Sequence, residues 1–168
     1  GGKVMPCERV GDPGGPGALH SRCQRQSEWF YPVRSRLLRR AGIRDRERVL
    51  DLGCGTGVVT PELRRRCRGC VVALDSDRRA LTHAPDRFQD VPRLAGRAPQ
   101  LPFAAGTFDL VFVQMFFLWV RDVPAALLEI RRVLRVGGVL IAAAEPDYAG
   151  RIERPADFFL REVIGTDS

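Results

Sequence analysis

Short apolar runs alternate along this chain with longer stretches whose apolar residues recur at helical spacing. The apolar runs are short enough for buried strands and occupy residues 48–52, 71–74, 108–113 and 139–144. Helical spacing covers residues 29–41, 58–66, 77–83 and 124–134. The run 91–95 predicts a weaker strand, because Pro92 and Arg93 interrupt it. Strands that alternate with helices predict an α/β fold with a parallel, doubly wound sheet.

Two residues predict helix ends. Gly42 follows the helical stretch 29–41 and can adopt the left-handed conformation that closes a helix. Asp77 comes just after the strand 71–74, and its side chain can cap the first turn of the next helix.

A glycine-rich turn follows the first predicted strand. Residues 49–57 read VLDLGCGTG, and the next apolar run ends at Asp75, 18 residues beyond Gly57. Glycines let the backbone turn tightly and lie close to a ligand, while a carboxylate at Asp75 can accept hydrogen bonds from both hydroxyls of a ribose. The pattern therefore predicts a site for the adenosine half of a cofactor. A nicotinamide dinucleotide, and with it an oxidoreductase, is disfavoured because Val58 stands where the G-x-G-x-x-G fingerprint needs its third glycine.

The same segment resembles the first motif of class I S-adenosylmethionine (SAM) dependent methyltransferases. The resemblance continues through VVALDSD, LPFAAGTFDLVF and ALLEIRRVLRVGGVLIAAAEPD in the family's order, and it covers about residues 40–150. It implies a Rossmann-like, mostly parallel sheet of the class I methyltransferase type, with SAM as the cofactor. It also implies methyl transfer by in-line displacement to a small-molecule acceptor, with oxygen, nitrogen and carbon all open as the acceptor atom. A SAM-fold module that binds without catalysing, or a remnant of such an enzyme, is the alternative.

The resemblance indicates which residues hold the cofactor. Asp51 is expected near the amino-acid tail, backbone groups around Gly53, Gly55 and Gly57 are expected to approach the cofactor closely, and Asp75 is expected to accept from the ribose hydroxyls. For both aspartates, the alternative is a strand-end carboxylate that caps a neighbouring helix.

The adenine side departs from the family's pattern. Where the family often has an aspartate that accepts from the adenine amino group, this chain has Arg97, whose guanidinium has only donors. Arg97 is expected to stack on the adenine, or to point to solvent while the backbone N–H of Ala98 bonds the ring. Gln114, which ends the strand 108–113, is expected to contact the tail and face the methyl group.

The acceptor side is expected to include Met115, Trp119, Glu145 and Tyr148. The segment EPDYAGRIERP resembles one that adjoins the acceptor pocket in a bacterial subgroup of the family. Core packing is the alternative for the apolar residues, and a turn or capping role is the alternative for Glu145. No catalytic base is assigned.

Composition and charge narrow the expected partners. No apolar run approaches the roughly 20 residues of a membrane span, and no apolar core of a secretory signal is present, so a cytoplasmic protein without a membrane partner is expected. The net charge of +7 comes almost entirely from arginine, since Lys3 is the sole lysine. Because those arginines are scattered over the predicted helices, no nucleic-acid partner is expected.

The five cysteines predict free thiols in a reducing compartment, because their number is odd. Cys67 and Cys70 have the C-x-x-C spacing of a zinc site, but no second pair of ligands accompanies them. They are expected to close a helix and open a strand, and no metal is predicted. Cys54 lies inside the glycine turn, where neither histidine is near it in sequence, so it is not predicted to be a nucleophile.

The two ends of the chain differ from its centre. Residues 1–24, which include His20, are rich in glycine and proline and predict a disordered or flexible arm before a methyltransferase domain at 25–168. In the family, the strand matching 139–144 is followed by a helix and an antiparallel hairpin. Here residues 155–164 can supply the helix and only four residues follow, so a domain lacking its last two strands is expected. Strand 139–144 would then be an open edge, which a homodimer could cover if the chain is not a fragment.

Overall fold

The computed structural model describes residues 15–82 and 90–145 of the 168-residue chain. Its helices are α1 (Gly15–Trp29), α2 (Tyr31–Arg40), α3 (Thr60–Arg66), α4 (Arg78–Thr82) and α5 (Val123–Val133), with short 3-10 turns η1 (Ile43–Asp45) and η3 (Phe117–Trp119). Its strands are β1 (Arg48–Leu52), β2 (Cys70–Asp75), β3 (Arg93–Ala95), β4 (Phe108–Gln114) and β5 (Leu134–Ala143). None of the helices in the described part is long and apolar enough to cross a membrane.

The five strands form one parallel sheet in the order β3-β2-β1-β4-β5. The chain runs outward from β1 to β3 and then returns to the other side of β1 with β4, so the order reverses between β1 and β4. In sheets of this kind, ligands bind beyond the carboxyl ends of the strands at this reversal. The α/β, doubly wound fold predicted from the sequence is confirmed.

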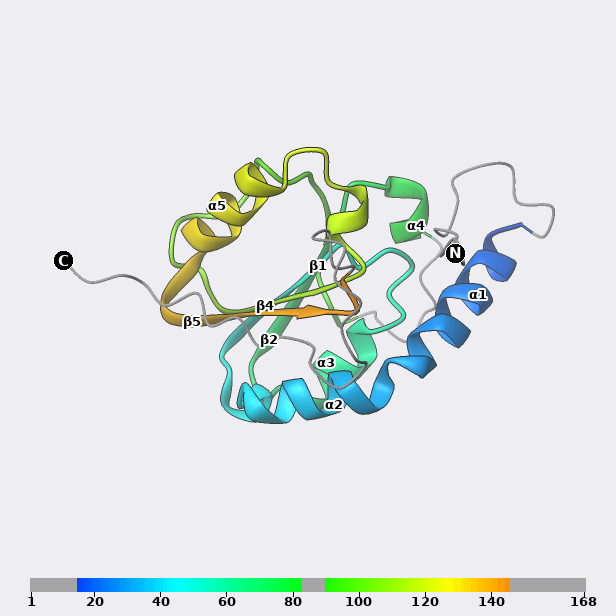
Figure 1. Ribbon diagram of the computed structural model, residues 1–168, viewed down its shortest axis with the longest axis horizontal. Helices are drawn as coiled ribbons and strands as arrows, with labels where there is room; N and C mark the ends of the chain where they lie inside the picture. Colours follow the sequence, from blue (N-terminus) through cyan, green and yellow to red (C-terminus); the bar gives the residue numbers. More distant parts are fainter. Residues whose placement is uncertain (1–14, 83–89, 146–168) are drawn as a thin grey trace, which may run out of the picture.

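Helices cover both faces of the sheet. Figure 1 shows α5 on one side and α2 with α3 on the other. Successive side chains of a strand point to opposite faces, so Leu50 and Val111 pack in the cluster beneath α5, whereas Val49 and Leu110 pack in the cluster that contains residues of α2 and α3. Because both faces are buried, the strands read as continuous apolar runs in the sequence.

Most predicted elements are confirmed, with shifted ends. Gly42 has φ +65° after α2, as expected of a helix terminator, and the Asp77 carboxylate accepts the Arg79 N–H at 2.9 Å in the first turn of α4. β5 begins at Leu134, which pairs with Phe108; regular pairing resumes at Val139 after an irregular stretch.

The prediction for the N-terminal arm is wrong for residues 15–24, which belong to helix α1. The predicted helix 29–41 is also divided, because α1 ends at Trp29 and α2 begins at Tyr31. Glycine, proline and the weak apolar spacing of this segment disfavour a helix, but contacts with the rest of the domain hold it. Residues 1–14, His83, Tyr148 and the predicted helix 155–164 lie outside the described residues.

Candidate functional site

The glycine turn lies at the carboxyl end of β1, beside the point where the strand order reverses. Gly53 has φ +76°, and the N–H groups of Gly53 and Cys54 donate to the Leu74 carbonyl oxygen of β2 at 2.8 and 3.2 Å. Gly55 has φ +55°, and a Cβ built on it would meet no atom within 4 Å. The loop is therefore tied to the sheet at its start and has open space beside Gly55, into which a ligand could fit.

Asp75, the last residue of β2, connects that strand with the loop. Its Oδ2 accepts the Gly55 N–H at 2.7 Å, and its Oδ1 accepts the Asp77 N–H at 2.8 Å before α4. A carboxylate oxygen has two lone pairs, so each oxygen can accept one further hydrogen bond. The predicted capping alternative is present in the contact with Asp77, and it leaves Asp75 able to accept from a diol.

Asp51 lies deeper, with only 3% of its surface exposed. Its Oδ2 accepts the Thr60 hydroxyl at 2.6 Å. Burial raises the pKa of Asp51 to about 7; the Thr60 hydrogen bond opposes the rise, the Asp75 charge adds to it and the Arg34 charge opposes it. A cation arriving nearby would favour the ionised carboxylate, which suits a group expected to face an ammonium.

Gln114, at the end of β4, belongs to a buried polar network around Arg34. The Arg34 Nη1 donates to Gln114 Oε1 at 2.9 Å and to the Ser27 carbonyl and hydroxyl oxygens at 3.0 Å. Its Nε donates to Glu62 at 2.8 Å, and Glu62 also pairs with Arg66. The hydrogen bond from Arg34 therefore fixes the orientation of the Gln114 side chain at the end of β4.

Sequence reasoning missed Arg34, which was grouped with the scattered surface arginines although only 4% of its surface is exposed. A signal was available, because Arg34 precedes the buried Leu37 and Leu38 by three and four positions and so lies on the apolar face of α2. A charged residue on such a face needs a partner, and Glu62 supplies it.

The segment after β4 lies against the glycine turn. A Cβ on Gly53 would come within 2.6 Å of the Phe116 ring, so only glycine leaves room for that ring. Met115 has φ +53°, and its N–H donates to Ala143 of β5. Trp119, in η3, is 44% exposed. The Phe116 side chain thus lies beside the glycine turn, and contact of Met115 or Trp119 with an acceptor stays a prediction.

Glu145 takes the capping alternative. Its carboxylate accepts the N–H of Phe116 at 2.7 Å and the N–H of Phe117 at 2.9 Å, at the start of η3. Burial raises the pKa of Glu145 to about 6, against the lowering effect of these two hydrogen bonds. Contact between Glu145 and an acceptor stays a prediction.

Arg97 and Ala98 follow β3 on the other side of Asp75. The Gly96 N–H donates to the Asp75 carbonyl at 3.0 Å, which brings this segment to the end of β2. Arg97 is exposed, and its carbonyl accepts the Gln100 N–H at 2.9 Å. The placement suits the adenine side, while stacking by Arg97 stays a prediction.

His20 is a second residue that sequence reasoning did not connect with the site. Its Nδ1 lies 2.9 Å from the hydroxyl of Thr56, inside the glycine turn. Because the residues around His20 predicted a flexible arm, no sequence signal pointed to this contact.

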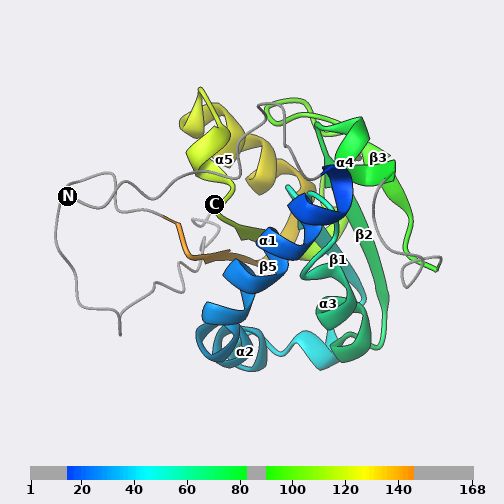
Figure 2. The ribbon, with the colours of Figure 1, turned by 90° about the vertical axis from the view of Figure 1, so that its right-hand side faces the viewer.

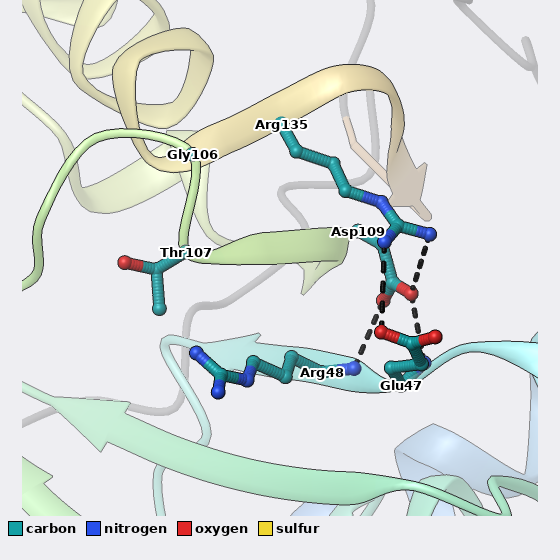
Figure 3. A pocket seen from close by; sticks show the side chains of 6 residues that line it. All are labelled: Glu47, Arg48, Gly106, Thr107, Asp109 and Arg135. Carbon is teal, nitrogen blue, oxygen red and sulfur yellow. Dashed lines mark hydrogen bonds and ion pairs between the residues drawn. The ribbon is translucent and has the colours of Figure 1, made fainter.

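A small polar pocket lies at the other end of the central strands from the glycine turn, at the amino ends of β1 and β4 (Figure 3). Asp109, which is 1% exposed, accepts the N–H groups of Glu47 and Arg48 at 2.7 and 3.1 Å and pairs with Arg135 at 3.2 Å. Its carboxylate is used in joining the strands, so this pocket is a structural anchor rather than the functional site.

Three cysteines lie in the glycine turn or around the start of β2. Burial raises the pKa of the Cys54 thiol, which keeps it protonated. Cys67 follows α3, and its thiol donates to the Arg46 carbonyl at 3.2 Å; Cys70 begins β2. Within residues 15–82 and 90–145, no group of three or more His, Cys, Asp or Glu side chains could hold a metal ion.

The residues present fit S-adenosylmethionine. The open side of Gly55 and the free lone pairs of Asp75 suit an adenosine, and the buried Asp51 carboxyl suits the ammonium of the tail. The apolar segment at Phe116 adjoins the same loop. No comparable set of groups surrounds the Asp109 pocket.

Comparison with known proteins places the chain in a family. A family profile described as "Methyltransferase domain" matches residues 50–142, more than half of the chain. Demethylmenaquinone methyltransferase of Mycolicibacterium paratuberculosis is 41% identical over 113 residues, which are 67% of this chain and 46% of that protein. The chain thus spans a little under half the length of this relative.

Solved structures agree in fold. A putative S-adenosylmethionine-dependent methyltransferase from Methanococcus maripaludis has a TM-score of 0.69 at 21% identity, covering 82% of this chain and 66% of that one. A SAM-dependent methyltransferase from Aquifex aeolicus has a TM-score of 0.65 at 24% identity, covering 79% and 72%. With the profile match, the glycine turn and Asp75, these findings show that the chain belongs to the class I SAM-dependent methyltransferase family, whose cofactor is S-adenosylmethionine.

Proposed function

We propose that this chain is the cofactor-binding part of an enzyme that transfers the methyl group of SAM to a small, largely apolar acceptor. The observation that supports this best is the contact between the glycine turn and the apolar segment after β4, where the Phe116 ring occupies the space beside Gly53. A methyltransferase must bring an acceptor to the methyl group, and this segment offers an apolar surface next to the glycine turn.

The cofactor supplies an activated methyl group on a sulfonium: as the acceptor atom bonds the methyl carbon, the carbon–sulfur bond breaks, its electron pair stays on sulfur, and the acceptor loses a proton. The protein's task is therefore mainly to align the two reactants, which can lower the barrier by about 7–11 kcal/mol. Asp51, Asp75 and the partly buried Gln114, which Arg34 orients, would do this by fixing the cofactor.

The acceptor class follows from the residues after β4. Met115, Phe116 and Trp119 are apolar and partly accessible, which suits a flat, apolar molecule better than a charged one. The name of the mycobacterial relative gives demethylmenaquinone as its acceptor. We therefore choose demethylmenaquinone, in its reduced form, as the first acceptor to test; a cytoplasmic location, a homodimer through β5 and the absence of a nucleic-acid partner stay predictions.

The test is an incubation of the chain with SAM that carries a deuterated methyl group and a panel of reduced quinones, followed by mass spectrometry. We expect one labelled methyl group on demethylmenaquinone and, at a SAM concentration near the parent's dissociation constant, far less product when Asp75 is replaced by alanine. The Asp45→Ala variant is the matched control, because Asp45 is an exposed aspartate away from the loop. A chain that binds S-adenosylhomocysteine but methylates no acceptor would instead support the non-catalytic module.

A further inference from the structure

Helix α1 contacts the site at two separate places. Near its start, His20 Nδ1 lies 2.9 Å from the Thr56 hydroxyl of the glycine turn. Near its end, the Ser27 hydroxyl and carbonyl accept from Arg34 at 3.0 Å, and the Gln114 amide lies 3.4 Å from the same hydroxyl. Figure 2 shows α1 running across this side of the domain. The helix therefore links the cofactor loop with the end of β4.

The two contacts lie on one face of the helix. His20 and Ser27 are seven residues apart, which is about two helical turns and places both side chains on the same side. Arg25 and Trp29 fall on the opposite side, where both are exposed, Trp29 by 78%. One face of α1 is thus directed at the site and the other at solvent.

The end of α1 near Ser27 is the better anchored one. Ser27 is buried, and Arg34, which holds it, is itself paired with Glu62 in the core. Helix α1 ends at Trp29, and α2 begins at Tyr31 after the single residue Phe30. The first half of α1 reaches the glycine turn through His20, so this side chain is a connection by which the helix can act on the loop.

The glycine turn needs such a support. Three of its residues are glycines, which have many accessible backbone conformations, and that freedom must be lost when a ligand binds. Thr56 lies between Gly55 and Gly57 and is buried. A hydrogen bond to its hydroxyl restricts the loop before the cofactor arrives, which increases affinity by lowering the cost of ordering.

We propose that α1 is a clamp over the cofactor site and that His20 is the positioning residue through which it holds the glycine turn in its binding conformation. The proposal rests on the cofactor site described above. His20 acts through Thr56 and needs no contact with the cofactor itself.

The test is a double-mutant cycle in the full 168-residue chain, with variants His20→Ala, Thr56→Val and both together. The dissociation constant of S-adenosylhomocysteine is measured by calorimetry. We expect each single variant to bind roughly fivefold more weakly, which corresponds to one neutral hydrogen bond, and the double variant to bind no more weakly than either one. Arg25→Ala, on the outer face of α1, should bind like the parent, and His20→Gln should recover part of the loss.

A second readout needs no ligand. Hydrogen exchange of the amides in residues 53–57 should be faster in His20→Ala and unchanged in Arg25→Ala, at equal thermal stability. Losses that add in the double variant, or unchanged exchange at the loop, would overturn the clamp. If the parent chain does not bind S-adenosylhomocysteine, the cofactor site fails, while the exchange measurement still decides whether His20 holds the loop.

Discussion

The backbone N–H of Gly55 donates a 2.7 Å hydrogen bond to the carboxylate of Asp75. The residue that the sequence assigns to the ribose therefore also fixes the glycine turn, so the two halves of the cofactor motif are one structural unit. A change at Asp75 should affect both the ligand's contacts and the shape of the loop that receives it.

Replacing Asp75 by alanine should weaken binding of S-adenosylhomocysteine by about 100-fold or more. Hydrogen bonds to a charged group are each worth about 1.5–3 kcal/mol, and the variant loses those to the ribose as well as the one to Gly55. Calorimetry measures the change, with Asp45→Ala as the control. A dissociation constant within about twofold of the parent value would remove Asp75 from the site.

Asp51 should make stability depend on pH. Its pKa is raised from the ordinary 3.8 to about 7, so the folded state holds a proton that the unfolded state releases between these values. The contribution of Asp51 to stability is therefore fully favourable at low pH and is lost as the pH rises through about 7. Asp51→Asn cannot lose a proton and should remove this dependence. The free energy of unfolding of Asp51→Asn minus that of the parent should therefore be larger at about pH 8 than at about pH 5.

Urea unfolding at both pH values measures this difference, and Asp45→Asn is the matched control because Asp45 is exposed. Asp51→Asn should also bind S-adenosylhomocysteine more weakly, since a neutral amide attracts the ligand's ammonium less than a carboxylate does. Equal pH dependence in the parent and Asp51→Asn would contradict the buried, proton-holding state of this residue.

Arg34→Met should lower the free energy of unfolding by about 3 kcal/mol, because it leaves Glu62, Ser27 and Gln114 without their buried donor. Arg64→Met is the control: it breaks an ion pair with Asp90 whose side chains are both exposed, which should cost less than about 1 kcal/mol. Chemical denaturation compares the two variants. Equal losses of unfolding free energy would mean that the hydrogen bonds of Arg34 stabilise the fold no more than an exposed ion pair does.

Glu145→Ala should lower the free energy of unfolding by about 1–3 kcal/mol, since the Phe116 and Phe117 N–H groups lose their acceptor. Binding of S-adenosylhomocysteine should change little, because the contacts of Glu145 are with η3. Denaturation and calorimetry on the same preparation separate the two effects. A large loss of cofactor affinity at unchanged stability would instead assign Glu145 to the site itself.

The strands, the glycine turn and the helix ends at Gly42 and Asp77 were predictable from the sequence. Each depends on local features: apolar runs buried on both faces, glycines at positive φ, and an aspartate that reaches the N–H of Arg79 two residues further on. The resemblance of the ordered motifs to the methyltransferase family also predicted the cofactor class, whereas the residues alone predicted only a site for an adenosine.

Helix α1 and the Arg34 network were not predictable in the same way. His20 contacts a residue 36 positions away, and Arg34 contacts Gln114 80 positions away. The place of Arg34 on the apolar face of α2 indicates that it is buried, but no period in the sequence indicates which polar groups it contacts. The role of Glu145 was left open for a related reason, since its partners at Phe116 and Phe117 become neighbours only when β4 and β5 pair.

The most direct test of the cofactor site is a calorimetric titration of the 168-residue chain with S-adenosylhomocysteine and, separately, with NADH, while circular dichroism confirms folding. We predict saturable binding of S-adenosylhomocysteine at one site per chain and no binding of NADH. A folded chain that binds NADH, or that binds neither compound, would contradict the assignment of the glycine turn and Asp75 to S-adenosylmethionine.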